Sequence, residues 1–258
     1  PSVVVLHDDG SFLTGEEAER VGGLELVRVA RDLRRDPMLQ ADPIVVGGQV
    51  STPYNMLRAL YAGMVERVCQ DHGAVPTHVV VTHPALSEGL QCDMVEHIAD
   101  ELFPGAQLVP EPVAAAVKFA CDGSLPARSN TVVFDLGGGT LDLAIIRRDG
   151  DRFTVLGEPS GMSEFGGIDI DDMVLGHVDA SLDGAIAKLD LADPIAFTTL
   201  DRLRAECRRA KEQLSYDAEA TVDASLPGNP ALVTMRRHEL EELLFPRLEA
   251  SMDVMEEM

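Results

Sequence analysis

The chain has 258 residues, of which 45% are hydrophobic and 4% aromatic, and it contains no tryptophan. Lysine and arginine number 21 against 44 aspartates and glutamates, so the formal net charge is −23. This length predicts one large domain or two lobes around an aliphatic core. The charge argues against nucleic acid and anionic membranes as partners, because both require clustered lysine and arginine. A small anionic ligand stays compatible, since backbone N–H groups and a metal ion can hold it locally.

The cysteines and the hydrophobic runs indicate the cellular setting. The four cysteines are widely spaced without a C-x-x-C pair, which predicts reduced and buried thiols; they are Cys69, Cys92, Cys121 and Cys207. No H-E-x-x-H pattern suggests a zinc site. No apolar run approaches the ~20 residues of a membrane helix, and no signal-peptide pattern is visible. We therefore expect a cytoplasmic protein.

The first 76 residues predict short strands and two helices. Residues 2–6 and 12–15 predict two strands joined by a turn. A helical pattern follows over 16–35, weakened by two adjacent glycines. A short strand and a turn then precede a second helix, for which Thr52 is a good N-cap and Pro53 suits the first position.

The next segments continue the alternation. Residues 77–84 ("THVVVTHP") form an apolar run typical of a strand buried on both faces. A helix is predicted over 87–102, then a strand leading into a turn over 106–112 and an alanine-rich helix. The connector 121–130 contains glycine, proline and serine. It is the predicted lobe boundary, which gives lobes over 1–125 and 126–258.

The rest of the chain begins with the hairpin 132–146, followed by a strand, turn and strand over 147–159. A glycine loop opens a helix within 161–182, and the strongest helical pattern covers 199–215. A hairpin and a C-terminal helix complete the chain. Strands and helices alternate in blocks, so the predicted class is α/β.

The hairpin 132–146 carries the most informative motif, D-L-G-G-G-T-L-D. Its three glycines can adopt positive φ and leave no Cβ in the way, so that their N–H groups can surround an anion. They are Gly137, Gly138 and Gly139, and Thr140 adds a hydroxyl. Asp135 and Asp142 lie close enough to hold a hydrated magnesium ion. The pattern predicts a phosphate and metal site on a hairpin.

Two familiar phosphate-binding motifs do not fit this stretch. The P-loop pattern fails because no lysine follows the glycines, and the dinucleotide fingerprint fails because "LDLAII" alternates like a strand. The plain alternative to a phosphate site is a bulged hairpin whose glycines serve only the turn.

The stretch "VVFDLGGGTLDLAII" closely resembles the second phosphate loop of the seventy-kilodalton heat-shock (DnaK-like) chaperones, members of the actin-like ATPase superfamily. Other stretches are similar to that family in the same order. They are "PSVVVLHDDGSFLTGEEAE", "VVVTHPAL", "VPEPVAAAV", "EFGGIDIDD" and "LRAECRRAKEQLS". The resemblance covers almost the whole chain and implies an actin-like (ribonuclease H-like) fold with two lobes, mixed sheets and flanking helices.

The resemblance also implies an ATPase that uses ATP or ADP and Mg²⁺. Asp135 and Asp142 would act on magnesium through water, and Gly137 to Thr140 would embrace the phosphates. Glu111 would orient the attacking water. The catalytic residues implied are therefore Glu111, Asp135 and Thr140. The alternative for Glu111 is a carboxylate that merely stabilises a helix N-terminus.

Further ligand contacts are implied on the second glycine loop and on the helix 199–215. Gly166 and Gly167 would let the backbone approach the nucleotide, with Asp169 nearby, or they could simply punctuate a loop. Lys211 and Ser215 would lie beside the adenosine, although a charged helix face is usually only solvated.

The chain departs from the family pattern in four ways. The first phosphate loop and the C-terminal adenosine motif are absent, so the sequence looks like a middle fragment of an ATPase domain or a naturally shortened one, incomplete at both ends. No lysine precedes Lys118, although the family has a catalytic lysine in its first lobe; Arg31 or Arg34 could take its place only imperfectly. Arg208 and Glu212 exchange the charges of a family pair.

The prediction is therefore an ATP-binding chaperone-like domain in which Mg-dependent hydrolysis is slow or lost and nucleotide drives lobe movement. Nucleotide is the expected ligand, and co-chaperone or client proteins are the further candidates. The alternative is a degenerate, non-hydrolysing actin-like scaffold that binds protein partners. A small-molecule kinase of the same superfamily would also need a sugar-type acceptor site, which the sequence does not reveal.

Overall fold

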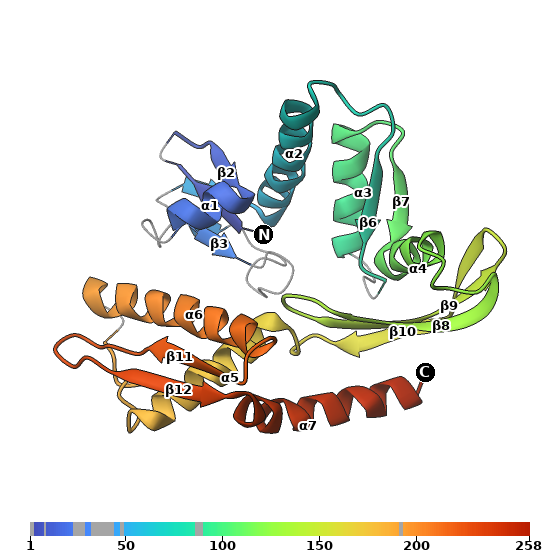
Figure 1. The fold of residues 1–258 in the computed structure, drawn as a ribbon. Coiled ribbons are helices and arrows are strands. Elements are labelled where there is room, and N and C mark those ends of the chain that lie inside the picture. The colour runs from blue at the N-terminus through green and yellow to red at the C-terminus, as the bar shows by residue number, and fades with distance from the viewer. Residues whose placement is uncertain are drawn as a thin grey trace. The chain divides into compact units, whose positions relative to one another are not determined.

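The computed structural model describes residues 3–7, 9–22, 29–31, 44–46, 49–85, 90–190 and 193–258. Within the chain, packing separates two units (Figure 1). The first comprises residues 1–136 and 141–162, and the second comprises residues 137–140 and 163–257. Both units mix helices with small sheets, which confirms the α/β class. This grouping differs from the lobe boundary predicted near residue 125, which stays a prediction.

The helices and strands of the first unit alternate along the chain. In order they are β1 (Val3–Leu6), β2 (Phe12–Thr14), α1 (Gly15–Gly22), β3 (Val29–Arg31), β4 (Ile44–Val46), β5 (Gln49–Ser51), α2 (Pro53–His72), β6 (Val80–His83), α3 (Leu90–Leu102), β7 (Gln107–Pro110), α4 (Glu111–Cys121), β8 (Arg128–Leu136), β9 (Leu141–Asp149) and β10 (Arg152–Met162).

The first sheet is antiparallel, with β1 between β2 and β3. All four residues of β1 are buried, as an apolar central strand requires. The predicted helix over 16–35 is wrong at 29–31, because these residues pair with β1 as a strand, and its residues 23–28 and 32–35 lie outside the described residues. A glycine-weakened helical pattern thus yields to strand pairing. Arg34, one candidate to replace the missing lysine, lies outside the described residues.

Helix α2 begins as predicted. The Thr52 hydroxyl oxygen accepts a hydrogen bond from the Asn55 N–H at 3.2 Å, and Pro53 occupies the first turn. A Cβ at Gly63 would lie 2.2 Å from the Thr14 hydroxyl oxygen, so this glycine lets the helix approach β2 closely. The helix ends at Gly73, whose φ of 67° is the left-handed cap that glycine favours.

Strands β6 and β7 are parallel and are connected through α3. Val81 packs with Val95 and Ala99 of α3. The prediction that this strand is buried on both faces is wrong, because Val80 is 56% exposed whereas Val81 is 5% exposed. Within this chain, β6 is covered on one face.

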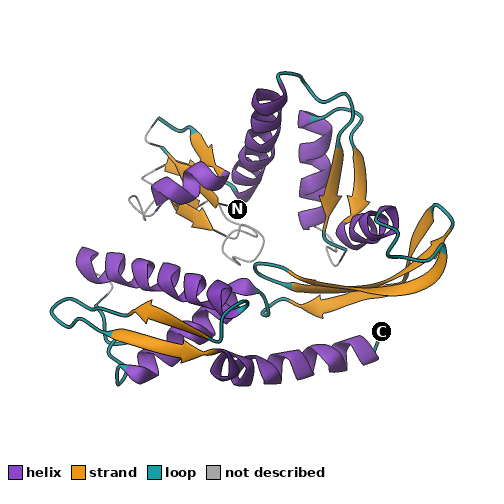
Figure 2. Ribbon diagram, in the orientation of Figure 1, coloured by secondary structure: helices purple, strands orange, loops and turns teal. Residues whose placement is uncertain are grey.

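Strands β8, β9 and β10 form an antiparallel sheet with β9 in the centre (Figure 2). Helix α4 covers one face, where Ala116 packs with Ala144 and Ile146 of β9 and contacts Val133 of β8. The long hairpin predicted from the sequence is confirmed.

The second unit contains, after the connection 137–140, α5 (Gly167–Ser181), α6 (Pro194–Leu214), β11 (Glu219–Asp223), β12 (Leu232–Arg236) and α7 (Arg237–Glu256). Helix α6 begins five residues before the predicted Thr199: Asp193 accepts from the Ile195 N–H, and Pro194 opens the first turn. Alternate residues of the β11–β12 hairpin are buried, as are four residues of α6 at helical spacing. Those four are Leu203, Cys207, Ala210 and Leu214.

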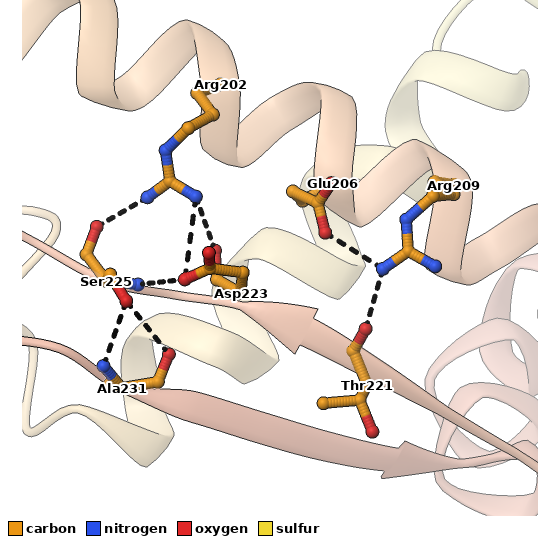
Figure 3. A network of polar contacts seen from close by, with 7 residues as sticks. All are labelled: Arg202, Glu206, Arg209, Thr221, Asp223, Ser225 and Ala231. Atoms are coloured by element: carbon orange, nitrogen blue, oxygen red, sulfur yellow. Dashed lines mark hydrogen bonds and ion pairs between the residues drawn. The ribbon is translucent and has the colours of Figure 1, made fainter.

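Two arginines of α6 attach the helix to β11 (Figure 3). Arg202 donates to the carbonyl oxygens of Asp223 and Ser225, at 2.8 and 2.5 Å. Arg209 donates to the carbonyl of Thr221 at 2.7 Å and also pairs with Glu206. The even-numbered residues of β11 make the hydrogen bonds to β12. The carbonyls of Thr221 and Asp223 therefore point away from β12, at the outer edge of β11.

The thiols are less uniform than expected. Cys69, Cys121 and Cys207 are free, but only Cys207 is fully buried, and Cys121 is exposed. Burial raises the pKa of the Cys207 thiol to about 12, and nearby carboxylates add to the shift. Among the described residues, no helix combines the length and the apolar character needed to cross a bilayer.

Candidate functional site

Two of the predicted site carboxylates share one face of the β8–β9 hairpin. Asp135 and Asp142 are direct partners in the strand register, so their side chains lie on the same face. Residues alternate across a strand, and this is also the face of Val133 and Ala144, on which α4 packs. Glu111 is the first residue of α4 and follows β7 directly. The first unit therefore places Asp135 and Asp142 side by side on the face that α4 covers, and Glu111 at the start of that helix.

The fit of this face to magnesium follows from its donor set. Carboxylate oxygens are the ligands that Mg²⁺ prefers, with water completing its shell. Two like charges directly opposite each other destabilise a strand pair, and a cation would offset that repulsion. In the described part of the chain, no group of three or more acidic, histidine or cysteine side chains could hold an ion by itself. The residues thus fit a hydrated ion held by two carboxylates.

The glycine loop 137–140 belongs to the second unit. The Gly137 N–H donates to the Thr140 carbonyl at 2.8 Å and closes the turn. None of the three glycines has a positive φ, contrary to the expectation from the sequence. No heavy atom lies within 4 Å of a Cβ built on Gly138, which is exposed. The backbone at Gly138 is therefore approachable from outside.

The second glycine loop is hydrogen-bonded to the first. The Gly167 and Ile168 N–H groups donate to the carbonyls of Gly137 and Gly138, at 2.9 and 2.8 Å. A Cβ on Gly166 would lie 2.5 Å from the Gly139 carbonyl carbon, so no side chain fits there. The two motifs are thus packed backbone to backbone, and this close approach explains the glycine at position 166.

The start of α5 is fixed by its own cap as well. Asp169 accepts a hydrogen bond from the Gly166 N–H at 2.8 Å, which satisfies one of the free amides of a helix N-terminus. Asp169, expected near the nucleotide, thus has a structural role at the cap.

Lys211 reaches from α6 to α5. Its Nζ lies 2.7 Å from Asp171 Oδ1 and donates to the Gly167 carbonyl at 3.0 Å. Burial raises the pKa of the Asp171 carboxyl above its ordinary value, and the Lys211 ammonium opposes this shift. Asp171 is not among the residues that the sequence predicts for the site, although it follows Gly167 by four residues and so shares its helix face.

The remaining predicted contacts lie further along α6. Ser215 caps the end of the helix, is exposed, and comes one turn after Lys211. Arg208 and Glu212 form a salt bridge at 3.2 Å, so the exchanged charges still pair. The ligand-binding and catalytic roles of all these residues stay predictions.

The chain combines an α/β fold with two glycine loops that are hydrogen-bonded to each other and a hairpin that carries two facing carboxylates. The sequence matches the profile of the family described as Hsp70 protein over residues 26–258. The chain therefore belongs to the Hsp70 family, as the resemblance implied.

Individual relatives agree with this assignment. The chain is 30% identical over 182 residues to a "Chaperone protein HscA homolog" of Shewanella denitrificans, covering 70% of this chain and 28% of that protein. It is 28% identical to a "Heat shock 70 kDa protein" of Neurospora crassa, covering 94% of this chain and 41% of the relative. "Heat shock 70 kDa protein 2" of Paracoccidioides lutzii is also 28% identical, covering 80% and 31%. The chain spans less than half the length of these relatives.

Proposed function

We propose that this chain is the ATP-binding part of a heat-shock chaperone of the Hsp70 type and binds ATP or ADP with Mg²⁺. The observation that carries the proposal is the placement of Asp135 opposite Asp142, on the face of the hairpin that α4 covers. Glu111 is the first residue of that helix. Only four residues connect the two strands, and three of them are glycines. Family membership supports the same function.

The side chains divide the task between charge and position. Bound Mg²⁺ would neutralise phosphate charge, held through water by Asp135 and Asp142. Main-chain amides of the loop 137–140 and the Thr140 hydroxyl bind the phosphates, and Glu111 orients the attacking water. Positioning and charge neutralisation are the main contributions of a protein to phosphoryl transfer. Ser215 marks the adenosine end of the site.

Hydrolysis is slow or lost in this proposal, and nucleotide binding drives a movement of two lobes. No lysine precedes Lys118 in the chain. Lys118 itself is exposed on α4 and pairs with Asp122 at 2.5 Å. Co-chaperones or clients as partners, and a cytoplasmic location, are part of the same proposal.

The test is calorimetry of the intact gene product with Mg·ATP. Asp142→Asn removes one of the two facing charges and is expected to weaken binding by about tenfold or more, as loss of an outer-shell partner of a metal typically does. Asp151→Asn is the matched control, because Asp151 lies in the turn at the other end of β9, roughly 30 Å away along the nine-residue strand. Equal affinities of the two variants would contradict the proposed site.

A non-hydrolysing scaffold is the second candidate function. The absence of any lysine before Lys118 favours it, because a site without that charge has lost part of its phosphoryl-transfer machinery. Failure of the unmutated full-length protein to bind Mg·ATP would favour the scaffold over the nucleotide-binding function.

A further inference from the structure

The ion pair between α5 and α6 is unusual in this chain for its burial. The Lys211 side chain is 19% exposed and that of Asp171 is 17% exposed, whereas Lys118 is 72% exposed. An ammonium group has three N–H donors. One of them is donated to the Gly167 carbonyl, and the ammonium nitrogen also lies 2.7 Å from Oδ1 of the Asp171 carboxylate as an ion pair. The charge of Lys211 is thus largely committed within the second unit.

The carbonyl that Lys211 contacts belongs to a peptide unit with a second fixed end. The Gly167 carbonyl and the Ile168 N–H are part of one planar group. Its oxygen accepts from Lys211, and its N–H donates to the Gly138 carbonyl at 2.8 Å. This single peptide therefore connects the ion pair to the glycine loop 137–140.

We propose that Asp171 and Lys211 are positioning residues that hold the Gly167–Ile168 peptide, and through it the loop 137–140, in the shape that receives phosphate. The proposal rests on the proposed function. It differs from the adenosine contact that the resemblance implies for Lys211, because the residue then acts on the phosphate end of any ligand. Removing either Asp171 or Lys211 leaves the other charge unpaired in a poorly solvated position, so both residues are needed.

The first test compares two ligands in the full-length protein. The affinities of Mg·ATP and of Mg·tripolyphosphate, which lacks adenosine, are measured by displacement of a fluorescent ATP analogue. Lys211→Met and Asp171→Asn are each expected to weaken both ligands by a similar factor of about ten or more, and Lys211→Arg is expected to recover most of the loss. A loss confined to ATP, with tripolyphosphate unchanged, would make Lys211 an adenosine contact and overturn the proposal.

Two exposed residues of the same unit supply matched controls. Asp172→Asn changes the charge of α5 one residue away, and Lys188→Met removes an exposed lysine that also donates to a carbonyl, that of Asp183. Neither variant should alter the affinity for either ligand. If the charge variants fail to fold, Gly167→Ala replaces them, because its Cβ would lie 3.3 Å from Lys211 Nζ and the ammonium would have to shift by a few tenths of an ångström. It should weaken both ligands, and unchanged affinities would overturn the proposal.

A measurement without ligand separates this proposal from the proposed function. Hydrogen exchange of the Gly167 and Ile168 amides reports the hydrogen bonds between the two loops. Protection should fall by about tenfold in Lys211→Met and stay unchanged in Lys188→Met. If the two variants show this pattern but the wild-type protein binds no Mg·ATP, only the proposed function fails. Unchanged protection in Lys211→Met would overturn the positioning role.

Discussion

Gly166 illustrates why the glycines of this chain could be located but not explained from the sequence. The sequence suggests conformational freedom, because glycine accepts positive φ. In the structure its φ is −154°, which any residue adopts. What excludes a side chain is the Gly139 backbone, 27 positions earlier in the chain. Such a contact depends on the fold and leaves no local signal.

Gly166→Ala should therefore be costly while Gly176→Ala should not. A Cβ on Gly166 meets backbone atoms at 2.5–2.7 Å, and backbone cannot move aside as a flexible side chain can. We expect a loss of about 1–3 kcal/mol in the free energy of unfolding. A Cβ on Gly176, in the interior of α5, meets nothing within 4 Å and should gain about 0.5–1 kcal/mol. Urea denaturation measures both, and equal midpoints would contradict the close approach.

The cysteines should differ in reactivity. Only the thiolate attacks a disulfide reagent, and burial raises the pKa of Cys207 to about 12. At pH 8 the exposed Cys121 should react with an aromatic disulfide within minutes, whereas Cys207 should react only on unfolding. Peptide mapping by mass spectrometry assigns each adduct. Labelling of Cys207 as fast as Cys121 in the native protein would contradict its burial.

At the scale of the element, local signals worked where they were complete. Thr52 followed by Pro53 marks the start of α2, and the glycine loop correctly joins two strands. The helical pattern predicts that α6 starts at Thr199, five residues too late, although Asp193 and Pro194 form the same cap-and-proline signal. Strand β3 could not be predicted, because it depends on pairing with β1, a partner 26 residues earlier.

The attachment of α6 to β11 leads to a prediction about the outer edge of that strand. Arg202→Ala and Arg209→Ala each remove charge-assisted hydrogen bonds to strand carbonyls. The side chains are partly exposed, so we expect about 1 kcal/mol each and about 2 kcal/mol together. Arg204→Ala, at an exposed position of the same helix, is the control and should stay within about 0.5 kcal/mol.

Chemical denaturation of the wild type, the two single variants, the double variant Arg202→Ala/Arg209→Ala and the control Arg204→Ala provides the comparison. A double variant as stable as Arg204→Ala would show that these arginines do not hold the strand. Loss of the arginines should also promote self-association in sedimentation experiments, because an uncapped strand edge is a template for pairing with another chain.

For the whole molecule, the family and the α/β class were predictable because the D-L-G-G-G-T-L-D hairpin and the order of motifs survive in this sequence. The lobe boundary near residue 125 and the roles of the site residues stay predictions, because they depend on long-range packing, which short motifs do not encode. The partner of Lys211 was missed for the same reason, since Asp171 lies 40 positions away on another helix.

The direct bonding of the two glycine loops has a mechanical consequence. The first amides of α5 donate hydrogen bonds directly to carbonyls of the glycine loop 137–140, without an intervening side chain. A ligand that displaces residues 137 or 138 should therefore also displace the beginning of the fifteen-residue helix α5. Lys211, which donates to the Gly167 carbonyl, connects this movement to helix α6. A displacement of the loop 137–140 at the tip of the hairpin thus reaches α5 through main-chain hydrogen bonds alone.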